Sequence, residues 1–324
     1  MAINDALICA YAFDGSGRAV ALDNRALESW TTDAGWLWIH LDRTKPETEL
    51  WLRDTAGLEP LAIEALLEEE TRPRCVSIGD GLLVILRGVN LNVGADPEDM
   101  VSIRVWVDAS RVITLRNRRL MAVQDLRDNL EKGDVPASPG ALLIDIAAYM
   151  IDRMGPVLMD LNETVDELED QVLEAPGHEL RTKLSKNRRQ AISLRRFLAP
   201  LREVLTRLHT DRTPLFDDMN RNHLREIADR LTRYIEELDS ARDRAAITQE
   251  ELAGRLADEM NKNMYVLSIV AGIFLPLGLL TGLLGINVGG IPGTQNNWAF
   301  TIVCVILVGL AVAVLWLFRR FRIL

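Results

Sequence analysis

Short apolar runs alternate with helix-period segments over the first third of the chain. Runs that are rich in aromatic or β-branched side chains and are bounded by turn residues predict strands, and they occupy residues 6–13, 35–42, 75–91 and 100–117. The last two of these segments have the pattern of hairpins, which turn at Gly79–Gly81 and at Asp108–Ser110. Helices are expected to begin at Pro46 and Pro60, because proline is favoured at the first position of a helix. The pattern therefore predicts a cytoplasmic α/β domain over residues 1–139.

Apolar residues spaced by three and four predict helices from residue 140 onward. The segment 140–174 ends on the acidic stretch "DLNETVDELEDQVLE", and after the turn "APGH" a basic stretch occupies residues 179–208. We expect a cytoplasmic helical hairpin over residues 140–214, in which the acidic and the basic helix pair through salt bridges. Contact of the basic helix with anionic lipid or nucleotide is the functional alternative to this structural role.

The next stretch is free of proline from Phe216 to Pro276, and Asp217 and Asp218 suit a helix start. The pattern predicts one helix over 218–284, about 100 Å long. Its cytoplasmic part, residues 215–263, forms a stalk continuous with the first span. Apolar and small residues recur along the stalk with gaps of three, four or seven, at positions 228, 231, 235, 238, 245, 252 and 256. A single stalk cannot bury such a stripe by itself, so the pattern also predicts an oligomer.

Residues 264–318 contain no Asp, Glu, Lys or Arg. Within them, residues 264–284 and 298–318 are almost wholly apolar, and each would span about 31 Å as a helix, close to the hydrocarbon thickness of a bilayer. We therefore predict two transmembrane helices, in preference to helices buried in a soluble core. Residues 285–297 then form the loop between the spans.

The tail, residues 319–324, reads "RRFRIL" and follows the second span directly. Basic residues are retained on the cytoplasmic side of a membrane, so the tail is expected in the cytoplasm. Two spans return the large N-terminal part to the same side, and "MAINDALICAYAFDG" lacks the pattern of a signal peptide. Only the loop 285–297 is expected to face outward.

The part before the first span is acidic. Three of the 37 basic residues lie in the tail and all 47 acidic residues lie before residue 264, so residues 1–263 carry a net charge of −13. This charge argues against a nucleic-acid partner and raises the local concentration of cations.

Residue types that hold metals or carry catalysis are scattered. Cys9, Cys75 and Cys304 are too far apart for a metal cluster or a disulfide framework, and we expect them to pack as small apolar residues. The histidines show no ligand spacing; they are His40, His178, His209 and His223. Regulatory metal sites at His178 and His223 are one interpretation, and ordinary surface positions are the simpler one. No nucleotide loop, Ser-His-Asp arrangement or His-Glu-x-x-His helix occurs, so neither enzyme activity nor a cofactor is expected.

The register of the stalk continues into the first span. Most of the positions that it reaches are small, and Gly278 and Gly282 form a small-xxx-small pair; in order, these positions are Asn261, Met264, Ser268, Ala271, Leu275, Gly278, Gly282 and Gly285. Such a stripe serves either tight helix packing or the lining of a pore built from identical helices. The periodicity alone favours neither interpretation.

Residues 261–287, "NKNMYVLSIVAGIFLPLGLLTGLLGIN", resemble the pore helix of the CorA-type divalent-metal transporters. That family carries a Gly-Met-Asn tripeptide at the outer end of the first of two C-terminal spans, and here the tripeptide is Gly285-Ile286-Asn287. The residues around Pro276 also fit, as does "RRFLAPLREVLTRL" at 195–208. The order of parts matches over essentially the whole chain. The Gly-Ile-Asn variant followed by "VGGIPG" is similar to the zinc-transport branch, the ZntB-type proteins.

The resemblance implies a CorA-like fold, with an α/β cytoplasmic domain, a long helical stalk and two C-terminal transmembrane helices in a funnel-shaped homopentamer. It implies transport of divalent metal cations across the bacterial inner membrane through a central pore. Zn²⁺ is the expected substrate, and Mg²⁺, Co²⁺, Ni²⁺ and Cd²⁺ are alternatives.

In such a pore Asn287 would form the ring that first meets the hydrated ion, because amide oxygens bind its water shell without trapping it. Pro276 would kink the helix, and Met264 and Leu275 would be the apolar constrictions. The residues implied to line the pathway are Asn261, Met264, Leu267, Ser268, Leu275, Gly278 and Gly282.

Two features depart from the family's usual pattern. Ile286 replaces the methionine, and the loop that follows has no acidic residue. An outer mouth without an acidic ring concentrates dications less, which leads to the hypothesis of proton-coupled zinc uptake. A membrane-anchored sensor or binding protein is the alternative of a different class, although an anchor would not need the small, heptad-spaced face of the first span.

Overall fold

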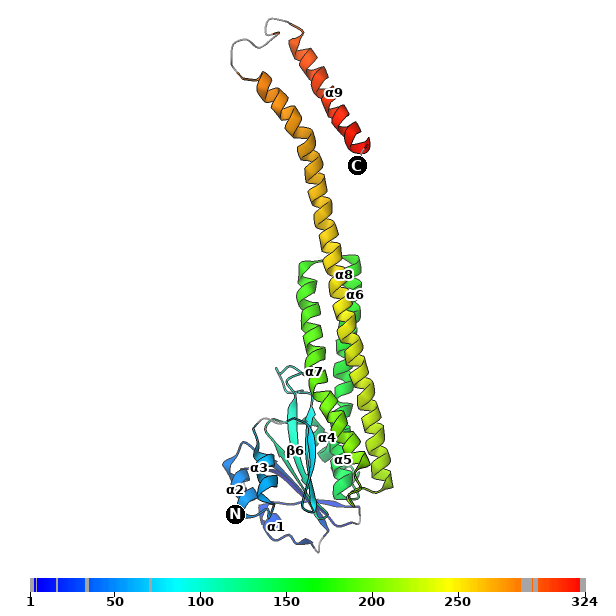
Figure 1. The fold of residues 1–324 in the computed structure, drawn as a ribbon. Coiled ribbons are helices and arrows are strands. Elements are labelled where there is room, and N and C mark those ends of the chain that lie inside the picture. Colours follow the sequence, from blue (N-terminus) through cyan, green and yellow to red (C-terminus); the bar gives the residue numbers. More distant parts are fainter. Residues whose placement is uncertain are drawn as a thin grey trace. The chain divides into compact units, whose positions relative to one another are not determined.

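The computed structural model of the chain describes residues 3, 5–15, 17–32, 35–69, 72–286, 293 and 297–320. The chain divides into two compact units, Met1–Gln249 and Glu250–Leu324. The boundary falls inside the longest helix, α8 (Asp218–Leu284), which therefore contributes to both units (Figure 1). This helix has the bounds that the proline-free pattern predicts.

A seven-stranded sheet forms the centre of the N-terminal unit. Its strands are β1 (Leu7–Phe13), β2 (Ala19–Ala21), β3 (Trp36–Asp42), β4 (Arg74–Ile78), β5 (Gly81–Gly88), β6 (Val101–Val107) and β7 (Arg111–Arg116). They lie in the order β2-β1-β3-β7-β6-β5-β4. Neighbouring strands are antiparallel except for β3 and β7, which pair in parallel with Leu37 opposite Arg111. Both predicted hairpins, β4–β5 and β6–β7, are confirmed.

Helices cover both faces of this sheet (Figure 1). Those of the α/β part are α1 (Asn24–Glu28), α2 (Pro46–Asp54), α3 (Pro60–Leu67), α4 (Met121–Glu131) and α5 (Pro139–Asp152). On β3, the residues Leu37, Ile39 and Leu41 belong to the core that includes α2 and α3. The alternate residues Trp38 and His40 point to the other face, where α5 contacts β3, β5, β6 and β7. Burial on both faces explains why β3 is an almost continuous apolar run.

The helical pattern over 140–174 forms two helices, α5 and α6 (Met154–Glu174), which are separated at Arg153. Pro156 lies in the first turn of α6 and has no N–H to donate to the carbonyl of Asp152, so the hydrogen-bond ladder is interrupted there. After the predicted turn, α7 (His178–Thr210) runs back beside α6. The N-terminal half of α8 lies alongside this pair (Figure 1).

The apolar stripe of the stalk is covered within the chain. Gln249 on α8 donates a hydrogen bond of 3.1 Å to Ser185 on α7, and a β-carbon on Gly155 of α6 would lie 2.9 Å from the Tyr234 hydroxyl of α8. The stripe residues of the N-terminal unit that are buried are Leu231, Ile235, Leu238 and Ala245. This part of the stripe therefore gives no evidence for the predicted oligomer, because the chain's own hairpin covers it.

The charges of the hairpin bind it to α8. Arg244 of α8 pairs with Glu169 of α6 at 2.6 Å and also with Asp166. Arg195 of α7 lies 2.7 Å from Asp239 of α8, without the alignment of a hydrogen bond. The acidic and basic helices lie side by side as predicted, but the predicted salt bridges between them are not found among the described residues, because the ion pairs of these helices are made with α8.

Candidate functional site

The second unit contains the charge-free end of α8 and the helix α9 (Ala299–Arg320). Both helices are long and apolar enough to cross a membrane, and their apolar windows are 0% buried within the chain. A helix in the core of a soluble domain would be mostly buried, so this exposure favours membrane spans over core helices. The basic residues Arg319 and Arg320 form the last turn of α9.

One face of α8 is covered by α9. A β-carbon on Gly272 would lie 2.6 Å from Cζ of Phe318, so the phenyl ring lies directly on this glycine. Successive residues of a helix are about 100° apart around its axis, and this places most of the half-buried positions on the same side of α8 as Gly272. They are Ile269, Gly272, Ile273, Pro276, Leu277 and Leu280, and Ala271 is the exception.

The residues expected to line a pathway occupy a neighbouring face of α8, which is exposed. Met264, Leu267 and Leu275 are 58%, 69% and 71% exposed, and Asn261, Ser268, Gly278 and Gly282 are exposed as well. A β-carbon added to Gly278 or Gly282 would meet nothing within 4 Å. The seven positions therefore share one face that the described part of the chain leaves uncovered, and their role in conduction stays a prediction.

The polar groups of this face are compatible with a membrane interior. The Ser268 hydroxyl donates a hydrogen bond of 2.8 Å to the carbonyl of Met264, one turn earlier. Its oxygen can still accept a hydrogen bond. The helix continues through Pro276, which has no N–H to offer the carbonyl of Gly272. The proposed kink at Pro276 stays a prediction.

The helix ends where the tripeptide begins. The N–H of Gly285 donates to the carbonyls of Thr281 at 2.9 Å and of Gly282 at 3.2 Å, which closes the last turn. Ile286 follows and is 49% exposed. Asn287, and with it the predicted ring at the outer mouth, lies outside the described residues.

Among the described residues of the whole chain, no group of three or more His, Cys, Asp or Glu side chains could hold a metal ion. His178 and His223 are exposed, as the simpler interpretation expects. Burial raises the pKa of the Cys9 and Cys75 thiols to about 11, so both remain protonated and pack as neutral groups.

His40 is a buried structural residue. Its Nδ1 lies 2.8 Å from Oγ1 of Thr114. The same oxygen accepts a hydrogen bond of 2.9 Å from Nε1 of Trp38. Burial, followed by the positive charges of Arg116 and Arg127, lowers the pKa of His40 to about 3. The imidazole is therefore neutral at physiological pH.

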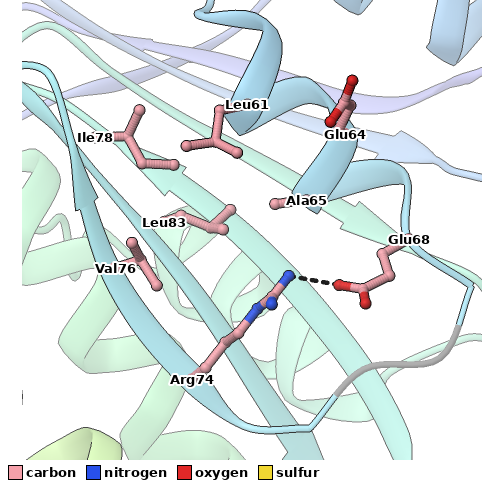
Figure 2. A pocket seen from close by; sticks show the side chains of 8 residues that line it. All are labelled: Leu61, Glu64, Ala65, Glu68, Arg74, Val76, Ile78 and Leu83. Carbon is pink, nitrogen blue, oxygen red and sulfur yellow. Dashed lines mark hydrogen bonds and ion pairs between the residues drawn. The ribbon is translucent and has the colours of Figure 1, made fainter.

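A groove of about 390 Å³ opens between α3 and the strands β4 and β5 (Figure 2). Its walls are mainly apolar, and an ion pair of 2.5 Å between Arg74 and Glu68 lies at one end. The residues that line it are Leu61, Glu64, Ala65, Glu68, Arg74, Val76, Ile78 and Leu83. None of these eight is a Ser, Cys or His. The sequence pattern did not predict this groove.

Known proteins share this architecture. The family model described as "CorA-like Mg2+ transporter protein" matches residues 33–320. The chain is 42% identical over 314 residues to the divalent cation transporter CmaX of Pseudomonas aeruginosa, covering 95% of this chain and 93% of that protein. It is 36% identical over 318 residues to the zinc transport protein ZntB of Yersinia pestis, covering 98% of this chain and 96% of that protein. The solved structure of the full-length CmaX protein matches with a TM-score of 0.86 at 40% identity, covering 98% of both chains.

Proposed function

Because this chain belongs to the family of CorA-like Mg²⁺ transporters, we propose that it moves divalent metal cations across a membrane along a pathway lined by the uncovered face of α8. One observation carries the proposal. The residues implied to line a pathway share one exposed face of α8, beside the contact that α9 makes at Gly272. A single helix cannot enclose a pathway, so identical copies must arrange this face around a common axis. The assembly we propose is the homopentamer implied by the family resemblance.

The chemistry of the face suits an ion that passes without being trapped. It offers the amide of Asn261 and the hydroxyl of Ser268 as oxygen acceptors, and residues 264–318 contain no carboxylate. Neutral oxygens bind the water shell of a dication, whereas a ring of carboxylates would hold the ion strongly. Asn287 would make the first contact at the outer mouth, and Met264 and Leu275 would form the narrow apolar points below it.

We assign Zn²⁺ as the transported ion. The relative named as a zinc transport protein matches nearly the whole chain, and the loop after Ile286 has no acidic residue. The relative named as a divalent cation transporter is also similar, so Mg²⁺, Co²⁺, Ni²⁺ and Cd²⁺ are the competing substrates in any test.

We further propose that the protein lies in the bacterial inner membrane with both termini in the cytoplasm. Arg319 and Arg320 at the end of α9 support this orientation, since basic residues remain on the cytoplasmic side. An outer mouth without an acidic ring concentrates dications less. We therefore propose that the inward proton gradient supplies the energy that concentrates Zn²⁺ in the cytoplasm.

The test is a flux assay on purified full-length protein in liposomes, with Zn²⁺, Co²⁺, Ni²⁺, Cd²⁺ and Mg²⁺ each supplied with and without a pH gradient. We expect the fastest uptake for Zn²⁺ and a further increase when the gradient is imposed. Uptake of another ion but not of Zn²⁺ would refute the assigned substrate, and no uptake of any ion would refute transport. Zn²⁺ uptake that ignores the gradient would refute the coupling alone.

A further inference from the structure

A polar pocket of about 330 Å³ lies in the N-terminal unit, apart from α8 and from the groove of Figure 2. The loop between β5 and β6 contributes Asp96 and Glu98 to it, α6 contributes Asp160, and α7 contributes Asn187. Three carboxylates and one buried amide therefore line a single pocket between three separate elements.

The amide of Asn187 identifies the kind of ligand that the pocket would take. This residue is only 4% exposed. Its Nδ2 donates a hydrogen bond of 3.1 Å to the carbonyl of Leu161. A carbonyl only accepts, so this bond fixes the orientation of the amide and leaves Oδ1 as the free atom. Oδ1 has no hydrogen-bond donor among the described protein groups. A buried acceptor without a donor is destabilising, unless a ligand supplies the donor or a positive charge.

Glu98 provides a second acceptor of the same kind. Its Oε2 is buried and also lacks a donor among the groups that the structure describes. Asp96 and Asp160 add two more carboxylates. The groups that could accept from or coordinate a ligand are therefore all oxygens, and no His or Cys lines the pocket. Oxygen donors suit hard dications such as Mg²⁺, whereas Zn²⁺ prefers sites that include nitrogen or sulfur.

The spacing of the carboxylates defines how such an ion would be held. Within the described residues no three acidic side chains lie close enough to bind one ion directly. Mg²⁺ gives up its water reluctantly and is commonly bound with several waters in place. A hydrated dication would present water hydrogens to Asn187 Oδ1 and Glu98 Oε2, the two atoms that lack donors.

We propose that this pocket binds a hydrated hard dication of the Mg²⁺ type, at a site distinct from the transport pathway and built within one chain. Lys183 and Lys186 line the rim of the same pocket and are exposed. Neither forms an ion pair with Asp96, Glu98 or Asp160 in the described part of the chain. Their flexible ammonium groups are thus internal competitors for the carboxylates, and binding of the ion would link the β5–β6 loop to the hairpin.

The experiment uses metal-free, full-length protein in detergent, titrated with Mn²⁺ alone as a paramagnetic substitute for Mg²⁺. Electron paramagnetic resonance gives the number of ions bound per chain and their affinity. Glu98→Gln keeps the shape of the side chain and removes its charge, so we expect the site to weaken at least about tenfold. Asn187→Leu should have a similar effect. Glu163→Gln, an exposed acid of α6 that does not line the pocket, is the matched control and should bind as the wild type does.

The double lysine variant tests whether the ligand of the pocket carries a positive charge. Lys183→Met together with Lys186→Met should strengthen Mn²⁺ binding several-fold, because the competing ammonium groups are gone. Equal number and affinity of bound ions in wild type and Glu98→Gln would overturn the proposal, since any bound ions would then lie outside this pocket. So would a loss of Mn²⁺ binding in the double lysine variant. Glu98→Gln and the lysine variant carry the test even if Asn187→Leu fails to fold.

Discussion

Phe318 of α9 lies directly on Gly272 of α8, at a point where a β-carbon would come within 2.6 Å of the phenyl Cζ. No side chain larger than hydrogen fits there unless the Phe318 ring or one of the two helices moves. Gly272 thus allows the two apolar helices to approach each other closely at this point.

Gly272→Ala should therefore destabilise the packing of α8 against α9. Overpacking in a tight contact typically costs about 1–3 kcal/mol, which we expect to appear as a lower thermal unfolding midpoint of the full-length protein in detergent. Gly254→Ala is the control, because it lies on the same helix and its β-carbon would meet nothing within 4 Å. That change should leave stability equal or slightly higher, since alanine favours helix. A midpoint for Gly272→Ala that equals that of Gly254→Ala would contradict the close contact.

The elements of the fold that could be predicted are those whose signal is local. The helix over 218–284 follows from its start at Asp218 and from the lack of an early proline, and the hairpins follow from their turn residues. The parallel pair of β3 and β7 could not be predicted, because Leu37 and Arg111 are far apart in the sequence and nothing local encodes their pairing. The short strand β2 and the helix α4 were not predicted either.

The stalk shows why periodicity alone misleads about partners. A repeat at positions such as Leu231, Ile235 and Leu238 reports that a face is covered, but a hairpin of the same chain covers it as well as an oligomer would. The stripe of the candidate pathway could be read from the sequence in the same way. The side that α9 occupies could not, and neither could the pocket around Asn187, which resembles any other polar residue of a basic helix.

Asn287→Ala should abolish divalent metal flux into proteoliposomes while the oligomer still forms. The amide oxygen is the proposed first contact for the water shell of the ion, and alanine offers no acceptor in its place. Flux and the mass of the assembly measure the two effects separately. Asn296→Ala, in the same loop, is the matched control and should retain flux. Normal flux through the Asn287 variant would remove this residue from the pathway.

Arg244→Met should loosen the stalk from the hairpin. Arg244 binds Glu169 through two nitrogens, at 2.6 and 3.1 Å, and also pairs with Asp166, so its loss should cost about 1 kcal/mol in stability. Arg225→Met is the control, because its ion pair with Asp229 is long, at 3.9 Å, and largely exposed. We expect a clear drop in the unfolding midpoint for the first variant only; a drop of the same size in both would show that the Arg244 network adds nothing.

Asp145→Asn should stabilise the protein at neutral pH. Burial, and then the negative charge of Asp134, raise the pKa of Asp145 from 3.8 to about 7. The folded state therefore holds a proton that the unfolded state has lost, so the stability from this group is present below pH 4 and is lost as the pH rises to 7. The advantage of the variant should grow by up to about 1.4 kcal/mol per pH unit over this window and then stay constant. Asp134→Asn should give a smaller change of the same sign, whereas a constant difference between pH 4 and 8 would contradict the shift.

His40 should produce the opposite pH dependence. Its pKa falls from 6.5 to about 3 in the folded state, owing to burial and to Arg116 and Arg127, with Asp42 and the Thr114 hydrogen bond acting against them. The unfolded chain binds the proton first, so stability is lost as the pH falls below 6.5, by up to about 1.4 kcal/mol per pH unit. Between pH 4 and 6.5 this loss is offset by the gain from Asp145, so the two contributions nearly cancel in the wild type.

Removing one group at a time should separate the two slopes. Unfolding midpoints of full-length protein, measured from pH 4 to 8, should fall with acid in Asp145→Asn and rise with acid in His40→Gln, relative to the double variant. The comparison rests on slopes, so a uniform loss of stability from replacing the buried imidazole does not affect it. His40→Gln with the same slope as the wild type would mean that the folded protein protonates this residue as readily as the unfolded chain does. That result would contradict the neutral imidazole between Trp38 and Thr114, on which the packing of this face of the sheet depends.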